Sequence, residues 1–254
     1  MKPILIIAAV PLETLLLENS LAQPVRSKAN GMESVEGMLG NLRIVVCTAG
    51  VGKINAAAAS AVMIERHCPQ LVVNIGCAGA YIGSGLSIGD LVVASDEVLV
   101  DEGVLVEEGW QDLRFMSLPV LELGGRLCFN TIPLSKHASE KAMQLADYYG
   151  VFLMRGRFAT VSTCSGTSMR GAELSRRWNV IAENMEGAAV AQVCLRYGVD
   201  CLEIRGISNL VEERDLKKWE IQRAVDVAQR FILKYIEELD RPDTSPYPMA
   251  VPEM

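Results

Sequence analysis

Glutamates are the side chains best suited to acid–base chemistry in this chain. Glu13 follows the apolar run 4–9 in the segment AAVPLE, where Pro11 can open a helix. Glu183 and Glu186 lie three residues apart in AENMEGAA, so a helix would place them on one face. A glutamate in a first helical turn is typical of a helix-dipole partner, and this alternative stays open for all three.

Two further features point to the recognition of a small polar molecule. Glu186 precedes the small, apolar run AAVAQVC, where a buried carboxylate is costly unless it accepts hydrogen bonds. The two hydroxyls of a ribose are suitable donors to one carboxylate. Asn209 ends the run EIRGISN, and its amide can both donate and accept. Such an asparagine ordinarily forms a turn, so its interpretation depends on the other motifs.

Three turns that follow apolar runs are rich in glycine or hydroxyl residues. They contain Gly50 and Gly52 in TAGVGK, Gly76 and Cys77 in NIGCAGA, and Ser165, Gly166 and Thr167 in VSTCSGT. Such turns can present backbone N–H groups to a ligand, although tight packing or helix capping requires the same residues. TAGVGK is not a P-loop, because Cys47 and Ile54 occupy positions that the P-loop motif gives to Gly and to Ser or Thr.

The composition restricts partners and chemistry. A net charge of -7 argues against nucleic acid as a partner. Two histidines, and seven cysteines without CxxC spacing, leave few candidates for a zinc site or a Ser-His-Asp triad, so we expect no metal and a small-molecule substrate. The N-terminal run lacks a signal-peptide cleavage region, and no segment has about 18 uninterrupted apolar residues, so we expect a soluble protein that does not enter the membrane.

These motifs must be positioned by an alternating α/β fold. Strands are predicted at 4–9, 42–48, 71–76, 90–98, 158–163 and 201–208, with a hairpin from Ser34 to Cys47 that turns at Gly40-Asn41. Helices are predicted at 11–19, 53–67, 136–149, 168–178, 186–197 and 213–239. Several strands are apolar on both faces, as in central parallel strands covered by helices. Residues 1–240 are therefore predicted to form a single-domain three-layer α/β/α structure with a mixed, mostly parallel sheet, and the proline-rich residues 241–254 a loose tail.

Taken in order, AAVPLE, TAGVGK, NIGCAGA, ENMEGAA and RGISN resemble the signature of the methylthioadenosine/S-adenosylhomocysteine nucleosidase and futalosine hydrolase branch of the nucleoside phosphorylase superfamily. The resemblance implies a nucleoside phosphorylase-like fold, a cytoplasmic enzyme without organic cofactor, and a homo-oligomer built on dimers. It implies that Glu13 takes a proton from the water that attacks the anomeric carbon. Glu186 would bind the ribose hydroxyls and Met185 would pack beneath the sugar. Gly76, Cys77, the turn at 165–167 and Asn184 complete the expected substrate site.

Two departures from adenine-specific nucleosidases indicate the substrate. Their pattern has Asp where this chain has Asn209, and an amide is not a comparable proton donor, so a 6-oxopurine fits better than adenine. The expected reaction is the hydrolysis of futalosine to hypoxanthine and dehypoxanthine futalosine in menaquinone biosynthesis. Asn184 replaces a more usual acidic residue, and the base-binding loop lacks its aromatic residue. Phe158, Trp219 and Tyr81 are candidates for stacking on the base, and Arg114 and Arg170 for binding the substrate carboxylate.

Three other functions remain open from the sequence. A phosphorylase would need cations at the side of attack, and no Arg is expected beside Glu13 or NIGCAGA. An adenine-specific nucleosidase would share the hydrolytic residues. A non-catalytic Rossmann-type module is the least favoured, because no G-x-G-x-x-G follows the first strand.

Overall fold

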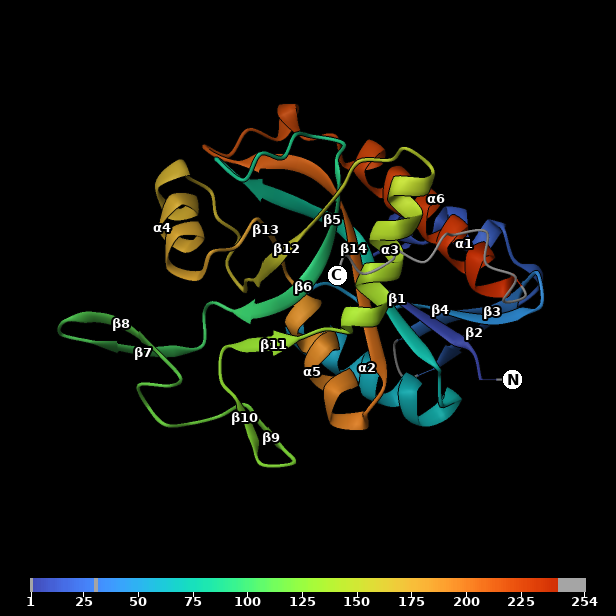
Figure 1. Ribbon diagram of the computed structural model, residues 1–254, viewed down its shortest axis with the longest axis horizontal. Helices are drawn as coiled ribbons and strands as arrows, with labels where there is room; N and C mark the ends of the chain where they lie inside the picture. Colours follow the sequence, from blue (N-terminus) through green and yellow to red (C-terminus); the bar gives the residue numbers. More distant parts are fainter. Residues whose placement is uncertain (1, 30–31, 242–254) are drawn as a thin grey trace, which may run out of the picture.

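A ten-stranded mixed sheet lies at the centre of the computed structural model, which describes residues 2–29 and 32–241 (Figure 1). Its strands are β1 (Ile4–Ala8), β2 (Ala22–Ala29), β3 (Met32–Leu39), β4 (Leu42–Thr48), β5 (Leu71–Tyr81), β6 (Leu91–Leu99), β11 (Thr131–Pro133), β12 (Leu153–Thr160), β13 (Ala182–Asn184) and β14 (Asp200–Val211). The order is β11-β6-β12-β13-β5-β1-β4-β3-β2, and β14 pairs with both β5 and β6. The two longest pairings, β14 with β5 and β12 with β6, are parallel. The hairpin of β3 and β4, and the pairing of β13 with β5, are antiparallel.

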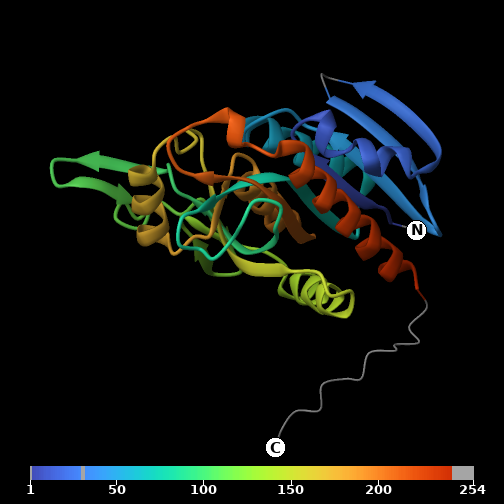
Figure 2. The same cartoon turned by 90° about the horizontal axis from the view of Figure 1, so that it is seen from above.

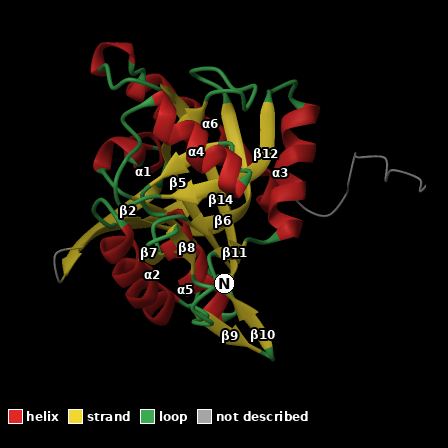
Figure 3. Ribbon diagram, turned by 90° about the vertical axis from the view of Figure 1, so that its left-hand side faces the viewer, coloured by secondary structure: helices red, strands yellow, loops and turns green. Residues whose placement is uncertain are grey.

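Helices cover both faces of this sheet (Figure 3). They are α1 (Leu15–Asn19), α2 (Lys53–His67), α3 (Lys136–Tyr148), α4 (Ser168–Trp178), α5 (Gly187–Tyr197) and α6 (Ile221–Asp240). Side chains of α1, α3 and α6 form one core with the sheet, and those of α2 and α5 form a second core on the other face. The expected three-layer α/β/α architecture is confirmed.

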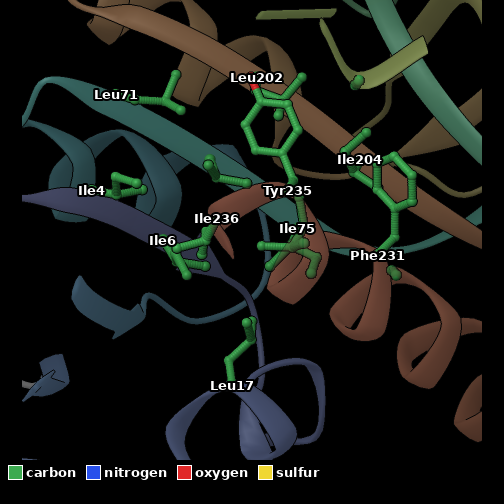
Figure 4. Close-up of a cluster of buried hydrophobic side chains, with 14 of the residues drawn as sticks. Ile4, Ile6, Leu17, Leu71, Ile75, Leu202, Ile204, Phe231, Tyr235 and Ile236 are labelled. Atoms are coloured by element: carbon green, nitrogen blue, oxygen red, sulfur yellow. The ribbon is translucent and has the colours of Figure 1, made fainter. Parts of the chain in front are cut away.

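The long C-terminal helix shows why the layers hold together. Phe231, Tyr235 and Ile236 lie on one side of α6 and point at Ile4, Ile6 and other apolar residues of the central strands (Figure 4). Burying a large apolar side chain contributes about 1.5–3 kcal/mol, so this face fixes the helix on the sheet. The strand residues are apolar on both faces because both faces are covered by helices.

Several element boundaries differ from those expected. The helix expected at 213–239 begins only at Ile221, because the preceding polar segment forms a loop with a short 3-10 helix, η2 (Leu216–Lys218). Asp215 caps that turn by accepting from the backbone N–H of Lys217. The strand expected at 158–163 is β12, which begins earlier and ends at Thr160, since the following residues leave the sheet as a loop.

Short strands were missed because they bury little apolar surface. β7 (Gly103–Val106) pairs with β8 (Gly109–Asp112), and β9 (Leu121–Leu123) with β10 (Arg126–Cys128). The β7–β8 hairpin projects at the end of the molecule opposite the N-terminal strands (Figure 2). None of the helices in the described part of the chain is both long and apolar enough to span a bilayer. The expected tail lies outside the described residues, apart from Arg241.

Candidate active site

A hollow of about 250 Å³ lies beside β5 and β14, next to the turn that follows β1. Seven of the expected site residues line it: Glu13, Cys77, Ser165, Asn184, Met185, Glu186 and Asn209. Gly76, Gly166 and Thr167 are not among its lining residues. Glu13, Glu186 and Asn209, the three residues on which the sequence analysis depends most, therefore line the same cavity.

Glu13 is buried at the end of a 3-10 turn, η1 (Pro11–Glu13), directly after β1. Its Oε2 accepts from the N–H groups of Ala9 (2.9 Å) and Val10 (3.2 Å), and its Oε1 accepts from Cys77 N–H (3.1 Å). Burial raises the pKa of the Glu13 carboxyl, and the nearby Arg205 opposes this effect only in part. The hydrogen bond from Val10 is local, whereas the hydrogen bond from Cys77 ties the turn after β1 to β5.

Gly76 shapes the site without lining it. A Cβ at this position would collide with the Glu13 carboxylate, and it would lie 2.6 Å from a guanidinium nitrogen of Arg205. The glycine therefore leaves room for an acid and a cation to approach the same stretch of β5.

Glu186 stands at the N-terminus of α5 and is also buried. Its Oε1 accepts from Gly52 N–H (2.9 Å), so the glycine turn TAGVGK donates to this carboxylate. Gly52 has a φ of 93°, which is strained for other residues. Asn184 holds the start of α5 in place, because its Oδ1 accepts from the N–H groups of Glu186 (2.9 Å) and Gly187 (2.6 Å).

Arg205, in the middle of β14, lies beside Glu13, and the expectation that no arginine does so is wrong. Its Nε donates to Glu203 Oε1 (2.9 Å), its Nη1 donates to the carbonyl oxygen of Cys77 (3.4 Å), and Nη1 lies 3.6 Å from Glu186 Oε2. Burial lowers and the facing carboxylates raise the pKa of Arg205, and the carboxylates prevail. The sequence signal was an Arg inside the apolar strand EIRGIS, where a cation needs buried partners.

Asn209 enters the hollow because β14 is irregular at this point. The register with β5 shifts between Ile207 and Asn209, and such a bulge redirects the side chains around it. Asn209 Oδ1 accepts from the Ser208 hydroxyl (2.8 Å), and its Nδ2 donates to the carbonyl oxygen of Leu210 (3.0 Å). The amide is therefore oriented by its own strand.

Glu183 also lines the hollow, and it lies in β13, so the helix-dipole role that the sequence left open does not describe it. Its Oε2 accepts from the Tyr81 hydroxyl (2.9 Å) and its Oε1 from Ser165 N–H (2.9 Å). Burial raises the pKa of its carboxyl. Gly79 separates Glu183 from Asn209, since a Cβ there would lie 3.1 Å from Asn209 Nδ2 and 3.6 Å from Glu183 Cγ.

The residues of the turn at 165–167 have different roles. Ser165 lines the hollow, whereas Thr167 caps α4 by accepting from Arg170 N–H (3.2 Å). The Gly166 carbonyl accepts from Arg214 N–H (3.2 Å) and so ties this turn to the loop that precedes α6. Helix capping, one of the two interpretations left open by the sequence, therefore describes Thr167.

Of the aromatic residues considered for stacking on the base and the arginines considered for binding the substrate carboxylate, only Trp219 lines the hollow. Phe158 is buried in the core, and Tyr81 is buried with its hydroxyl on Glu183, while Trp219 lines the hollow. Arg114 and Arg170 are not lining residues: Arg114 stacks on Phe129 at 4.6 Å, and Arg170 pairs with Glu173 at 3.0 Å. The geometry of this chain therefore gives no support to their selection as carboxylate-binding cations. The cation at the mouth of the hollow is Arg214, which lies 4.7 Å over the Trp219 ring.

Comparisons with known proteins agree with this geometry. A model of the phosphorylase superfamily matches residues 3–237. The 5'-methylthioadenosine/S-adenosylhomocysteine nucleosidase of Bacillus thuringiensis (strain Al Hakam) is 28% identical over 239 residues, covering 93% of this chain and 99% of the relative. The nucleosidase of the same name from Neisseria meningitidis, solved with methylthio-immucillin-A, superposes with a TM-score of 0.82 at 23% identity, covering 94% and 100% of the two chains. Futalosine hydrolase of Helicobacter pylori strain 26695 superposes with a TM-score of 0.81 at 24% identity, covering 93% and 98%.

The chain belongs to the phosphorylase superfamily, and its mixed sheet between helices is the nucleoside phosphorylase-like fold. The curated relatives to which it is similar along nearly its whole length are 5'-methylthioadenosine/S-adenosylhomocysteine nucleosidases. Membership of this superfamily argues against the non-catalytic nucleotide-binding module.

Proposed function

We propose that this nucleosidase hydrolyses a 6-oxopurine nucleoside, and that its substrate is futalosine, which yields hypoxanthine and dehypoxanthine futalosine in menaquinone biosynthesis. The observation that carries the proposal is the amide of Asn209 at the bulge of β14, in the hollow that also contains Glu13 and Glu186. The similarity to futalosine hydrolase of Helicobacter pylori supports it.

In this proposal the two carboxylates act on the water and the sugar. Glu13 accepts a proton from water as the water attacks the anomeric carbon, and its three backbone donors fix the orientation of the carboxylate. Glu186 accepts hydrogen bonds from the ribose hydroxyls, and Met185 packs against the sugar. Negative charge beside the hollow stabilises a cationic ribosyl group more than the neutral substrate, which lowers the barrier.

The base is recognised by a donor and an acceptor. Asn209 donates its Nδ2–H to the 6-oxo oxygen and accepts from N7–H as the base departs. Glu183, on the other side of Gly79, accepts from N1–H of the oxopurine. Adenine has an unprotonated N1, so it would set a lone pair against this carboxylate. Trp219 offers an aromatic face at the same hollow.

Phosphorolysis is the main rival, because Arg205 is a buried cation beside the site of attack. Three carboxylates, those of Glu13, Glu186 and Glu203, neutralise this arginine. Their excess of negative charge repels phosphate, which favours water as the nucleophile. Base release should therefore be unchanged on adding phosphate, and a phosphate-dependent rate would contradict hydrolysis.

The decisive experiment is a panel of nucleosides assayed for free base without phosphate. Futalosine, inosine, 5'-methylthioadenosine and S-adenosylhomocysteine are compared at equal concentration. We expect the highest kcat/KM for futalosine, with hypoxanthine as the released base. A higher kcat/KM for either adenine nucleoside would overturn the proposal.

Arg214 is expected to bind the aromatic carboxylate of futalosine. Since a charge-assisted hydrogen bond contributes about 1.5–3 kcal/mol, Arg214→Gln should raise KM for futalosine about 10-fold or more and leave KM for inosine nearly unchanged. Lys218→Gln is the matched control, because Lys218 lies in the adjoining hollow and pairs with Glu212 at 2.8 Å. Equal KM changes for both nucleosides in Arg214→Gln would remove Arg214 from this role.

The pH profile should report the environment of Glu13. The base is active only when ionised, and burial raises its pKa above the usual glutamate value. Activity is therefore present above this raised pKa and is lost as the pH falls through it. The acid limb of kcat/KM should lie above the ordinary glutamate range near 4.3. A limb at or below that range would show that another group limits the rate.

We further propose a homo-oligomer built on dimers in the cytoplasm. Leu15 at the start of α1, Val51 at the hollow and Ile54 in the first turn of α2 are large apolar side chains with exposed surface, as expected of a surface that a second copy covers. Sedimentation of the full chain would give the assembly. The match of the family model to residues 3–237 supports one domain over residues 1–240, and the tail at 241–254 stays a prediction.

A further inference from the structure

Two carboxyl groups that the proposed mechanism does not use face each other behind Arg205. Glu97 comes from β6 and Glu203 from β14, and neither has any exposed surface. Both converge on Gly187 at the start of α5, where a Cβ would meet oxygen atoms of each carboxyl. Neither residue lines the hollow.

Only one member of this pair contacts a cation. Glu203 Oε1 accepts from Arg205 Nε (2.9 Å), whereas Glu97 has no ion pair within residues 2–29 and 32–241. Glu97 instead accepts from the Thr160 hydroxyl at Oε2 (2.6 Å) and from Asn184 Nδ2 at Oε1 (2.5 Å). Glu203 Oε2 is buried without a hydrogen-bond partner among the described residues. A carboxylate can only accept, so a proton on the neighbouring Glu97 would supply the donor that this oxygen lacks.

The geometry points to a single proton shared by Glu97 and Glu203, carried by Glu97, in a pair that positions Arg205 and Asn184 for the reaction. This inference rests on the proposed function in one respect, because it assigns the pair a role in nucleoside cleavage. Glu203, ionised, holds the guanidinium from one side. Glu97, neutral, donates to Glu203 and accepts from Asn184.

The pair thereby connects two networks of polar contacts in the active site, each described here as an arm. One arm runs from Glu203 through Arg205 to Glu13 and Glu186. The other runs from Glu97 through the Asn184 amide to the backbone N–H groups at the start of α5. An ionised Glu97 would be a buried charge without a cation, next to the charge of Glu203, which is strongly unfavourable.

The surroundings favour a proton on Glu97. Burial and the charge of Glu203 raise the pKa of Glu97 well above its usual range. The other titratable groups that face the pair are Arg205, Glu186 and the thiols of Cys194 and Cys201. The contact with Cys194 raises the pKa of Cys201, so that thiol also stays protonated.

The proton can be observed directly by infrared spectroscopy of the full chain at neutral pH. A buried, protonated carboxyl gives a carbonyl band that is separate from the carboxylate bands. We expect wild type to show such a band, Glu97→Gln to remove it, and Glu203→Gln to retain it at a shifted frequency. The absence of the band in wild type, or its persistence in Glu97→Gln, would overturn the assignment.

A second variant provides an independent test in case Glu97→Gln or Glu203→Gln does not fold. Thr160→Val removes the hydroxyl that donates to Glu97, so the same band should move to higher frequency. No shift in this variant would also contradict the assignment. These spectra need no substrate, so they stand or fall independently of which nucleoside the enzyme cleaves.

Rescue by an uncharged amide tests the positioning role. Glu97→Ala should lower kcat about 10- to 100-fold, and Glu97→Gln should recover most of this loss, because an amide can still donate to Glu203. Glu203→Gln should shift the acid limb of kcat/KM to lower pH, because Arg205 would then act more strongly on Glu13. If Glu97→Gln were no more active than Glu97→Ala, the charge of Glu97 would matter and the inference would be wrong.

Discussion

Replacing Glu13 by Gln should lower the rate of base release by about 10³-fold, since general-base catalysis contributes roughly 10²- to 10⁴-fold. The amide occupies nearly the same volume but cannot take the proton from water. It also places an NH₂ group against backbone donors that now serve the carboxylate, such as Cys77 N–H and Ala9 N–H. The measurement is kcat for hypoxanthine release from futalosine.

Glu33→Gln is the control for this experiment. Glu33 is an exposed carboxylate on β3 that pairs with Lys28, so its replacement should leave kcat unchanged. Circular dichroism and substrate binding would show that Glu13→Gln is folded and occupied. Retention of more than about a tenth of the wild-type kcat would assign the base to another residue, because a positioned general base contributes at least about 10²-fold.

Asn209→Asp should reverse the preference between oxopurine and aminopurine. The carboxylate cannot donate to a 6-oxo oxygen, but it can accept from an exocyclic amino group and, when protonated, donate to N7. Each mispaired buried contact costs about 1–3 kcal/mol, and two contacts change, so the ratio of kcat/KM values should shift by about 10²- to 10⁴-fold. The measurement compares futalosine with 5'-methylthioadenosine.

Asn19→Asp provides the matched control, because Asn19 is an exposed amide at the end of α1. It should leave the ratio of the two kcat/KM values unchanged. If Asn209→Asp lowered both activities equally, Asn209 would contribute to folding or general binding and not to the choice of base.

Strands and helices could be predicted from the sequence where the apolar runs were long. The strands at 42–48 and 71–76 and the helix at 53–67 are present, because burial on one or both faces imposes a regular pattern. The hairpins β7–β8 and β9–β10 left no comparable pattern, since they project from the sheet. The start of α6 at Ile221 was missed because capping by Asp215 is a local interaction that periodicity does not record.

The site was only partly accessible from local motifs. Glu13 and Asn209 come after the strands predicted at 4–9 and 201–208, so a common sheet edge could be expected for these two residues. Arg205 lies inside a strand, and its contacts with Glu203, Cys77 and Glu186 depend on how β14 lies against β5. Arg214 entered the hollow because the 212–220 segment is a loop and not a helix.

The sequence by itself determined the alternation of strands and helices and the chemical types at the strand ends, because both are written in local patterns of polarity and turn residues. The tertiary structure alone decided which of these groups meet, which carboxylates face Arg205, and that the carboxyl groups of Glu97 and Glu203 converge on Gly187. The physical reason is that charge balance and desolvation in a buried site depend on distances between segments far apart in the chain, and no local pattern records such distances.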